Sequence, residues 1–551
     1  MKINVLNKIE KLYSRQIRVE YVTLMASLIL CFFYNHRFWE TFITSIGGLD
    51  LGNTTLLFFS FISVVLLFNL LLTIFSFRYV LKPVLAILFI CTALASHFTN
   101  SYGAVIDKVM IQNIFETDIC EATELINGKL IFSLLIFGAL PTLVFSTIRI
   151  DFSPWKRSLT SKAIIMAMTV IFFTIYVFVS YKSIAPAFRQ HREMRYLLTP
   201  TNYIQALNGY RKLKYRKVEP VAKIGLDAKK SKTWKRSDRK TVTLIIVGET
   251  ARAANFSLNG YPRLTNPQLG ARKDIFNFSN VQSCGTATAV SIPCVFSSLG
   301  RENYSDTKAS SQQGLLSVLQ HAGFDVRWRD NNSGCKGVCK EVAFEDLSKP
   351  VLGEPDCNEE ECYDERLLRG LKDLVRGAKN DLVIVLHQKG SHGPAYWKRY
   401  PRNFSRFGPV CSTTKFSDCT TESIVAAYDN TILYTDNVIN QAIDMLMNQK
   451  EIDSSLIYFA DHGESLGEKN MFLHGTPFVI SPIEQRHVPM LMWMSDGFQD
   501  RLRLRRSCLD ARRALPYSHD NVFHSILGLL GISTSVYRPE LDILNGCTNA
   551  E

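Results

Sequence analysis

The stretch SCGTATAVSIPC holds three hydroxyl side chains between two cysteines, Cys284 and Cys294. A strand-like run precedes it, its Cys-Gly pair predicts a turn, and a helix is expected to begin near Thr286. A hydroxyl at a helix amino terminus lies beside unpaired N–H groups and the positive end of the helix dipole, where a phosphate binds well. Thr286 is therefore a candidate nucleophile, although the same position suits a simple N-cap. Thr288 and Ser291 are interpreted as ordinary helix or turn residues.

Acidic and imidazole side chains follow several apolar runs in the same half of the chain. Glu249 follows TVTLIIVG, and Asp461 and His462 follow SLIYFA. His387 ends DLVIVLH, and His392 comes shortly after it. Any one of these side chains could be a cap or a turn former, but carboxylate and imidazole together suit zinc or manganese, and three protein ligands with an open position are typical of catalytic sites. A metal would supply the acidity that a threonine hydroxyl lacks.

The elements that must position these residues begin at Thr241. From there, short apolar runs alternate with stretches of helical spacing, which predicts an α/β domain with a mostly parallel sheet and helices on both faces. Such sheets bind their ligands at the carboxyl ends of the strands. The predicted strands cover residues 241–248, 325–330, 381–387, 455–461 and 488–495. The predicted helices cover residues 314–323, 365–377, 421–449 and 520–531.

The first half of the chain is different, because it holds five apolar stretches of nearly the 20 or so residues that cross a bilayer. They cover residues 21–38, 54–77, 80–98, 130–148 and 163–180. The first is the least regular, since Asn35, His36 and Arg37 interrupt its end. Lys and Arg are concentrated before the first stretch and in the second and fourth loops, so the amino terminus is expected in the cytoplasm and everything after Ser180 outside it.

Cysteine usage supports export of the second half. Ten of the 13 cysteines lie beyond residue 280, in close pairs that are typical of disulfides in an oxidising compartment. The spacing pairs Cys284 with Cys294, Cys335 with Cys339, Cys357 with Cys362 and Cys411 with Cys419, and leaves Cys508 to join Cys547. A structural zinc site is the alternative, but the CxxC spacing that it would need is missing.

The net charge of +13 is concentrated in a basic linker after the last membrane stretch. Such a linker is either simply solvated or attracted to anionic lipid head groups, and nucleic acid is not an expected partner for an exported segment. The expected domains are a membrane domain over residues 1–183, the linker with bridging helices at the periplasmic membrane surface over 184–240, and a periplasmic catalytic domain over 241–551.

Five segments resemble the lipid A phosphoethanolamine transferases, inner-membrane enzymes of Gram-negative bacteria whose catalytic domain belongs to the alkaline phosphatase and sulfatase superfamily. These segments are VGETARAANFSLNGYPRLTNPQL, SCGTATAVSIPC, DNNSGCKGVC, LHQKGSHGPAYWKRYP, and DHGESLGE with the following FLHG. The likeness extends over essentially the whole chain.

The resemblance implies that Glu249, Thr286, Asp461 and His462 bind one zinc ion and that Thr286 becomes phosphorylated. Other site residues follow by the same resemblance. His392 and His474 would line the site, and the resemblance leaves open whether they also hold a second, weaker zinc. Ser333, Lys336 and His387 would contact the phosphoethanolamine group. Asn113, Thr117 and Glu121 would bind substrate. These last three recur at i, i+4 and i+8, which places them on one face if the segment is helical.

The reaction expected from the resemblance is a two-step transfer of phosphoethanolamine from phosphatidylethanolamine to a phosphate of lipid A. The protein would act as a monomer, and the product would bind cationic peptides such as polymyxin or colistin less well. A sulfatase or phosphodiesterase is disfavoured, because no C/S-x-P-x-R motif surrounds Thr286. A heptose or periplasmic glucan as acceptor stays open. A non-catalytic zinc-binding protein would need a broken ligand set, which the sequence does not show.

Overall fold

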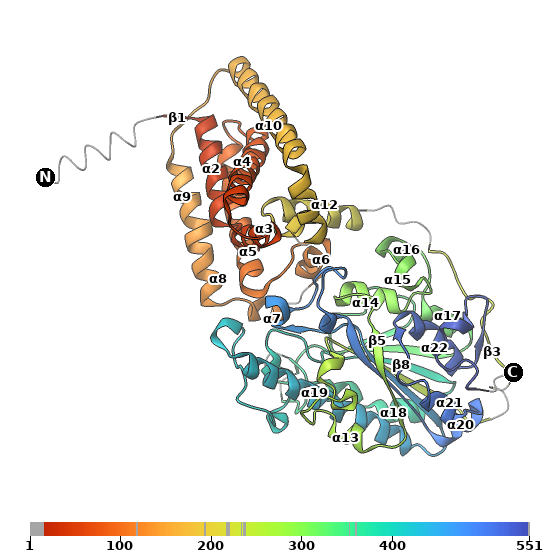
Figure 1. Cartoon of the computed structure of the whole chain (residues 1–551). Coiled ribbons are helices and arrows are strands. Elements are labelled where there is room, and N and C mark those ends of the chain that lie inside the picture. Colours follow the sequence, from red (N-terminus) through yellow and green to blue (C-terminus); the bar gives the residue numbers. More distant parts are fainter. Residues whose placement is uncertain are drawn as a thin grey trace. The chain divides into compact units, whose positions relative to one another are not determined.

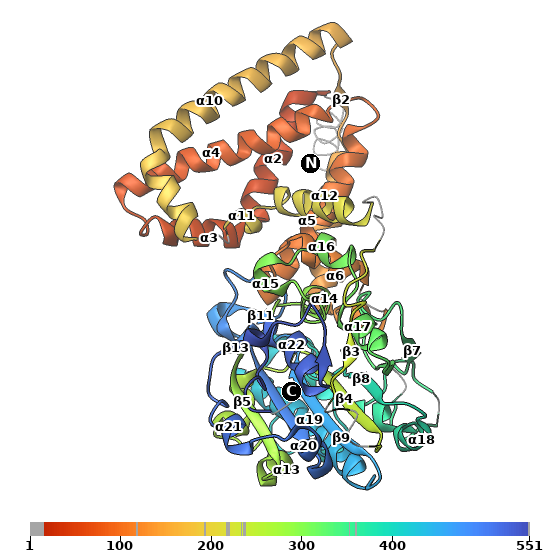
Figure 2. The ribbon, with the colours of Figure 1, turned by 90° about the vertical axis from the view of Figure 1, so that its right-hand side faces the viewer.

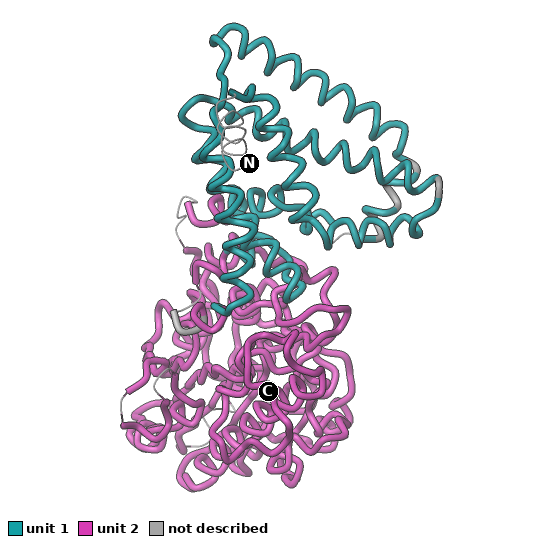
Figure 3. The backbone as a smooth tube through the Cα atoms, turned by 90° about the vertical axis from the view of Figure 1, so that its left-hand side faces the viewer, with its two compact units in different colours: residues 1–111, 126–209 teal, residues 112–125, 210–551 magenta. Residues whose placement is uncertain are grey.

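The computed structural model describes residues 16–116, 119–191, 194–215, 221–232, 234, 238–351, 353–358 and 361–548. The chain forms two compact units (Figure 3). Unit 1 comprises residues 1–111 and 126–209, and unit 2 comprises residues 112–125 and 210–551. A short segment between the apolar stretches thus belongs with the second half of the chain.

Unit 1 is helical because its sequence is a series of long apolar runs. Its helices are α2 (Val19–Phe33), α3 (His36–Ser45), α4 (Leu51–Ile74), α5 (Leu81–Tyr102), the first part of α6 (Lys108–Glu116), α8 (Gly128–Ser133), the π-helical η1 (Leu134–Ala139), α9 (Leu140–Thr147), α10 (Trp155–Gln190), α11 (Met194–Leu197) and most of α12 (Thr201–Lys214). Strands β1 (Ile17–Arg18) and β2 (Ile150–Asp151) pair in parallel. Among the described residues, four spans are long and apolar enough to cross a membrane, and the pair α2–α3 makes a fifth if it is one bent span. Five membrane helices therefore fit the described residues.

The bend of 66° between α2 and α3 falls where polar residues interrupt the first predicted stretch. Asn35 is buried there, and its amide donates to the carbonyls of Leu30 and Thr199 at 2.9 and 2.8 Å. The amide oxygen of Asn35 accepts from the N–H of Thr199 at 2.8 Å. Leu30 lies in the last turn of α2 and Thr199 lies far along the chain, so the Asn35 side chain joins the end of α2 to backbone outside that helix.

Unit 2 is built on an eight-stranded sheet in the order β13-β5-β12-β9-β4-β8-β6-β7. Its strands are β4 (Thr241–Gly248), β5 (Ile275–Gln282), β6 (Asp325–Asp330), β7 (Ala343–Asp346), β8 (Leu382–His387), β9 (Asp453–Ala460), β12 (His487–Met494) and β13 (Tyr517–Ser518). β12 runs antiparallel to both β5 and β9, and the other pairs are parallel. The predicted mostly parallel sheet is confirmed, and the central strands are apolar on both faces because helices cover both.

The helices of unit 2 lie on both sides of this sheet (Figures 1 and 2). On one side are α13 (Pro267–Ala271), α18 (Leu371–Gly377) and the long α19 (Thr421–Met447); on the other are α14 (Thr288–Val295), α17 (Leu315–His321) and α22 (Asp520–Leu529). The remaining short helices are the end of α6, α7 (Ile119–Glu124), the end of α12, α15 (Gly300–Asn303), α16 (Asp306–Ser310), α20 (Asp496–Leu502) and α21 (Arg506–Asp510). Two small antiparallel pairs complete the unit, β3 (Lys229–Lys230) with β14 (Ile532–Ser533) and β10 (Ser465–Leu466) with β11 (Phe472–Leu473).

All five predicted disulfides are formed in unit 2. Cys284–Cys294 ties the turn before α14 to the last turn of that helix, and both of its cysteines are buried. Such cross-links require an oxidising compartment.

Candidate active site

The register of the central strands brings the predicted ligands together. In the parallel ladder of β4 and β9, Gly248 pairs with Ala460, so Glu249 and Asp461 leave the sheet side by side. His462 follows directly. The carboxyl oxygens of Glu249 and Asp461 and a ring nitrogen of His462 lie within 4.8 Å of one another, and all three residues are buried. This is the strand-end cluster that the sequence predicts.

The charges in this cluster perturb one another strongly. Burial and the neighbouring Glu249 carboxylate raise the pKa of Asp461 to about 6. Burial alone would lower the pKa of His462, but Asp461 and Glu249 raise it to about 10. The pKa of Glu249 is held well below its usual range by His462, although burial acts against this. Two buried carboxylates beside an imidazole form a negatively charged pocket that a divalent cation would neutralise.

The donor set fits zinc. Oδ2 of Asp461 is fully buried and accepts no hydrogen bond among the described residues, although Nε2 of His462 lies 3.3 Å from it. Nε2 of His462 also lies 3.2 Å from Oε1 of Glu249, so the imidazole nitrogen and both carboxylates face one point. Borderline nitrogen and hard oxygen donors that converge in this way are typical zinc ligands.

The hydroxyl that reaches this cluster is that of Thr288, which differs from the sequence-based expectation. Helix α14 begins at Thr288, with Ala287 as its extended N-cap residue, and not at Thr286. Oγ1 of Thr288 lies 3.1 and 3.0 Å from the two carboxylate oxygens of Glu249 and 3.3 Å from Nε2 of His462. Thr288, dismissed above as an ordinary helix residue, occupies the first helical position beside the metal-ligand cluster.

Thr286 points elsewhere. Its Oγ1 donates to the carbonyl of Thr476 at 2.6 Å, and its own carbonyl accepts from the N–H of Gly475 at 2.7 Å. Thr286 therefore fastens the turn before α14 to the loop that follows His474. The residue predicted to be the nucleophile connects two loops of the site, and its hydroxyl is engaged with a backbone carbonyl.

Asn332, which is not among the residues predicted from the sequence, contacts the cluster through Glu249. Its Nδ2 donates to Oε2 of Glu249 at 2.7 Å and to the carbonyl of Gln388 at 3.0 Å. Asn332 lies just beyond the end of β6, so the strand-end rule that identified Glu249 would also have found it.

His387 lies behind Asn332 and is fully buried. Its Nδ1 is 2.7 Å from Oδ1 of Asp330, and its Nε2 is 3.3 Å from Nδ2 of Asn332. Burial alone would lower the pKa of His387, but the Asp330 carboxylate raises it. Since both ring nitrogens face protein groups, the geometry favours support of Asn332 over the predicted contact with the phosphoethanolamine group.

The two remaining histidines lie together at the site as expected. The ring centroid of His474 is 4.5 Å from that of His462 and 5.2 Å from that of His392. Nδ1 of His474 is 2.9 Å from Oε2 of Glu464, which is fully buried and also accepts from the hydroxyl of Tyr396 at 2.8 Å. Because Glu464 holds Nδ1, the other ring nitrogen of His474 is the one left for chemistry.

His392 is held by a buried ion network. Nε of Arg399 donates to the carbonyl of His392 at 2.8 Å, and the same guanidinium contacts Glu361 and, at 2.8 Å, Glu124 of α7. Burial lowers the pKa of the His392 imidazole to about 3, so this ring is neutral at ordinary pH. Glu124 belongs to the short segment that joins unit 2 from between the apolar stretches.

The predicted substrate-binding residues are only partly described. Ser333 and Lys336 follow Asn332, and Nζ of Lys336 lies 3.1 Å from the carbonyl of Ser333 and 3.4 Å from Oε2 of Glu116. Asn113 lies in α6, which ends at Glu116. Thr117 lies outside the described residues, and of Glu121 only the backbone, in α7, is described.

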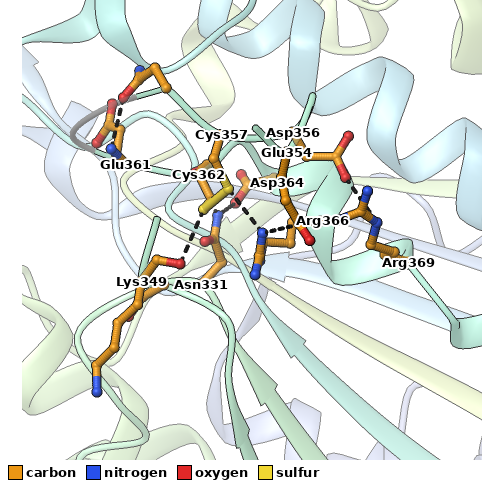
Figure 4. Close-up of a disulfide and its surroundings, with 12 residues drawn as sticks. Asn331, Lys349, Glu354, Asp356, Cys357, Glu361, Cys362, Asp364, Arg366 and Arg369 are labelled. Carbon is orange, nitrogen blue, oxygen red and sulfur yellow. Dashed lines mark hydrogen bonds and ion pairs between the residues drawn. A yellow bond between two sulfur atoms is a disulfide. The ribbon is translucent and has the colours of Figure 1, made fainter. Parts of the chain in front are cut away.

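The disulfide Cys357–Cys362 supports the loop that carries Asn332 (Figure 4). Nδ2 of Asn331 donates to the carbonyl of Cys362 at 3.0 Å and to Oδ1 of Asp364 at 2.8 Å. The Asp364 carboxylate also accepts the N–H groups of Lys389 and Gly390 at 2.8 and 2.9 Å, on the path to His392. One buried carboxylate thus ties the loop after β6 to the loop after β8.

Residues 241–532 match the family model described as Sulfatase, and residues 64–215 match the model described as "Phosphoethanolamine transferase EptA/EptB". Unit 2 is therefore a sulfatase-like domain with a candidate metal centre at the carboxyl edge of its sheet. The chain as a whole belongs to the lipid A phosphoethanolamine transferase family.

Three similar proteins show how far the likeness extends. Phosphoethanolamine transferase EptA of Escherichia coli K12 is 39% identical over 536 residues, 96% of this chain and 97% of the relative. Phosphatidylethanolamine transferase Mcr-1 of Escherichia coli is 39% identical over 430 residues, 76% of this chain and 79% of the relative. The integral membrane lipooligosaccharide phosphoethanolamine transferase A of Neisseria meningitidis has 32% identity and a TM-score of 0.93, with 97% of this chain and 100% of that chain covered.

Proposed function

We propose that this protein transfers phosphoethanolamine from phosphatidylethanolamine to a phosphate of lipid A, and that Thr288 carries the group between donor and acceptor. The observation that carries the proposal is the contact of Thr288 Oγ1 with Glu249, at 3.0 and 3.1 Å, inside the cluster of Glu249, Asp461 and His462. The names of the similar proteins EptA and Mcr-1 support the chemistry of the transferred group.

Glu249, Asp461 and His462 would hold one zinc ion beside Thr288. When bound, zinc would act as a Lewis acid that lowers the pKa of the threonine hydroxyl and stabilises charge on phosphoryl oxygens. Two of these side chains, Glu249 and His462, orient Thr288 by themselves, because its hydroxyl is within hydrogen-bond reach of both Glu249 oxygens and of Nε2 of His462.

In the first step, Oγ1 of Thr288 forms a bond to the phosphorus of phosphatidylethanolamine while the bond from phosphorus to the glycerol oxygen breaks. The hydroxyl proton passes to the Glu249 carboxylate, and the departing diacylglycerol oxygen receives a proton from His474. Glu464 keeps Nδ1 of His474 occupied, so Nε2 performs this transfer. Covalent capture divides one difficult transfer into two easier ones.

In the second step, an oxygen of a lipid A phosphate attacks the phosphorus of phosphothreonine 288. The bond from phosphorus to Oγ1 breaks and Thr288 regains its proton. The proton of the attacking phosphate oxygen passes to Nε2 of His474, which restores the proton that His474 gave to diacylglycerol. The ring of His392 lies beside this transfer, with its centroid 5.2 Å from that of His474. At each step phosphoethanolamine passes from one oxygen atom to another, so no other reactant is needed.

Substrate binding involves the residues beyond β6 and the segment that includes α6. Lys336 would place a cation on the donor phosphate, with Ser333 beside it. Asn113, Thr117 and Glu121 would bind the ethanolamine part, where the Glu121 carboxylate matches the ammonium group. The enzyme would work as a monomer in the inner membrane of a Gram-negative bacterium, with a cytoplasmic amino terminus and a periplasmic unit 2.

The functional consequence is a less negative cell surface. Masking a lipid A phosphate with an ammonium group weakens the attraction for cationic peptides, so we propose that this activity confers resistance to polymyxin and colistin.

The test replaces the two threonines separately. Thr288→Ala should abolish phosphoethanolamine addition to lipid A, by at least about a thousandfold, and Thr286→Ala should retain most of it. The measurement is mass spectrometry of lipid A from a host strain that lacks its own transferase. Addition of phosphoethanolamine by Thr288→Ala, or its loss in Thr286→Ala alone, would assign the nucleophile to the other hydroxyl. No modification of lipid A by the unsubstituted protein would contradict the proposed acceptor.

A further inference from the structure

A cavity of about 330 Å³ lies along one face of α14. Ala289, Pro293 and Phe296 line it, and their spacing of i, i+4 and i+7 places them on one side of the helix. Thr288, at the amino end of the same helix, immediately precedes Ala289. A molecule bound in this cavity therefore extends from the far end of α14 toward the residue that carries phosphoethanolamine.

Four charged side chains also line the cavity, namely Lys336, Lys340, Asp306 and Glu341. Oε2 of Glu341 accepts from Gln313 and Ser317 at 2.8 and 2.7 Å, and Oδ1 of Asp306 accepts from the hydroxyl of Tyr304 at 3.2 Å. Lys336 lies within the loop closed by the disulfide Cys335–Cys339, and Lys340 directly follows it. The ammonium group of Lys336 already faces Glu116 and the carbonyl of Ser333. Lys340 forms no ion pair with a carboxylate in the described part of the chain. Of the two lysines that line the cavity, it is therefore the one without an acidic partner among the described residues.

We propose that this cavity binds the phosphorylated sugar head group of the acceptor. The inference rests on the proposed function, since an acceptor of that kind carries sugar rings and a second phosphate that the donor head group lacks. The apolar face of α14 suits the carbon face of a sugar ring, and Lys340 supplies a point charge for the phosphate that does not react. Gln312 places a polar side chain along the same cavity for the sugar hydroxyls.

The test is Lys340→Glu in the full-length protein, with Lys308→Glu as the matched control. Lys308 is an exposed lysine of α16 that does not line the cavity. Two rates are measured in mixed micelles: release of diacylglycerol from phosphatidylethanolamine without acceptor, and transfer at increasing concentrations of purified lipid A. Lys340→Glu should raise the lipid A concentration at half-maximal transfer about tenfold, with little effect on diacylglycerol release.

An unchanged dependence on lipid A, an equal fall in both rates, or the same effect in Lys308→Glu would overturn this assignment. Absence of any transfer to lipid A by the unsubstituted protein would instead contradict the proposed function. The two failures are therefore distinguishable.

A second, independent observation concerns His519, a buried residue at the N-cap of α22. Its Nδ1 accepts from the N–H of Cys284 at 3.1 Å, and its Nε2 donates to the carbonyl of Ala460 at 3.0 Å. These partners fix the ring as the neutral tautomer with its hydrogen on Nε2. Burial also lowers the pKa of His519 to about 3.

Both backbone partners lie next to the site. Cys284 belongs to the turn that leads to Thr288, and Ala460 directly precedes Asp461. The carbonyl of Cys284 accepts from the guanidinium of Arg301, and the N–H of Arg301 donates to Oδ1 of Asp520 at 2.8 Å. His519 at the start of α22 therefore holds the N–H of Cys284, and Arg301, which is itself bonded to Asp520 of α22, holds its carbonyl.

We infer that His519 is a positioning residue that fixes the distance between Thr288 and the metal-ligand strand. It touches neither the substrate nor the reacting atoms. Its imidazole is a rigid bridge between the turn before α14 and the end of β9, and a shift of about 1 Å between reacting groups can cost about a hundredfold in rate.

The test compares His519→Asn, His519→Gln and His519→Ala with His524→Asn, which removes another buried histidine of α22. Asn keeps an acceptor near the position of Nδ1, and Gln keeps a donor near the position of Nε2. His519→Ala should lower kcat about 10- to 100-fold, with KM for phosphatidylethanolamine and bound zinc unchanged, and Asn or Gln should restore part of it. The inference would be overturned if all three His519 variants fold and keep a kcat within about twofold of that of the unsubstituted protein. An equal loss in His524→Asn would also overturn it.

Discussion

At the scale of single residues, the site depends on which of two neighbouring threonines faces the ligands. Thr286 and Thr288 are two positions apart, and the chain changes from extended at Ala287 to helical at Thr288. Their hydroxyls therefore point to different partners, the Thr476 carbonyl and the Glu249 carboxylate. Helix starts inferred from sequence are uncertain by one or two residues, which is the size of this error.

Zinc binding is predicted to depend on the three clustered ligands. Asp461→Ala and His462→Ala should each lower the zinc content of the purified protein severalfold, because a catalytic site with two remaining ligands binds zinc weakly. Metal content is measured by mass spectrometry of the purified protein. Asp436→Asn, which changes a buried carboxylate on α19, is the control and should keep its zinc. Undiminished zinc in both ligand variants would contradict the assignment.

Glu464 is predicted to act through His474. Glu464→Gln should lower the rate of transfer about 10- to 100-fold, the usual cost of losing a carboxylate that orients a catalytic imidazole. Transfer is measured by release of diacylglycerol from labelled phosphatidylethanolamine. Glu468→Gln is a suitable control, because Glu468 pairs with Arg252 and not with a site histidine. Equal rates in the two variants would remove Glu464 from the proposed mechanism.

At the scale of elements, the site exists because strands end in register and helices hold the loops that follow. β4 lies between β8 and β9, and its parallel partners bring His387 and Asp461 to the same edge as Glu249. Helix α19 is joined to the neighbouring helix α13. Asp436 of α19 accepts the N–H groups of Gln268 and Leu269 at 2.9 and 3.1 Å and so caps α13.

Asp436 is predicted to make stability depend on pH. Burial raises its pKa to about 7, so its contribution to stability is fully present below the pKa of the unfolded chain, near 3.8, and is lost as the pH rises to about 7. Asp436→Asn cannot ionise. The melting temperature of this variant relative to the unsubstituted protein should therefore rise from pH 5 to pH 7 and level off above pH 8, as measured by thermal unfolding in detergent. A difference that does not change with pH would show that Asp436 does not titrate in this range.

At the scale of the whole molecule, a helical unit with exposed apolar surface is joined to a disulfide-bonded α/β unit. The α10 span is only 6% buried within the protein, which suits contact with lipid. Five disulfides in unit 2 fit a location outside the cytoplasm, because such cross-links persist in an oxidising compartment.

The orientation can be tested with cysteine labelling of the intact cell. A cysteine introduced at Ser158, in the fourth loop, should react with a membrane-impermeant maleimide only after lysis, and one at Ser535 in unit 2 should react in intact cells. Both positions are outside the proposed catalytic machinery. In the same cells, the unsubstituted protein should raise the polymyxin concentration needed to stop growth severalfold, and Thr288→Ala should not. Reversed labelling would overturn the predicted topology.

The sequence by itself determined the two-part architecture, the α/β class, all five disulfide pairs and the strand-end ligands. These features depend on hydrophobic periodicity, cysteine spacing and the rule that parallel strands end at one edge, which are all local or pairwise properties of the chain. Only the tertiary structure decided that Thr288 faces the ligands, that the Glu464 carboxylate holds Nδ1 of His474, and that His387 stands behind Asn332. Those outcomes depend on side-chain directions and on contacts between residues far apart in the chain, which no sequence pattern specifies.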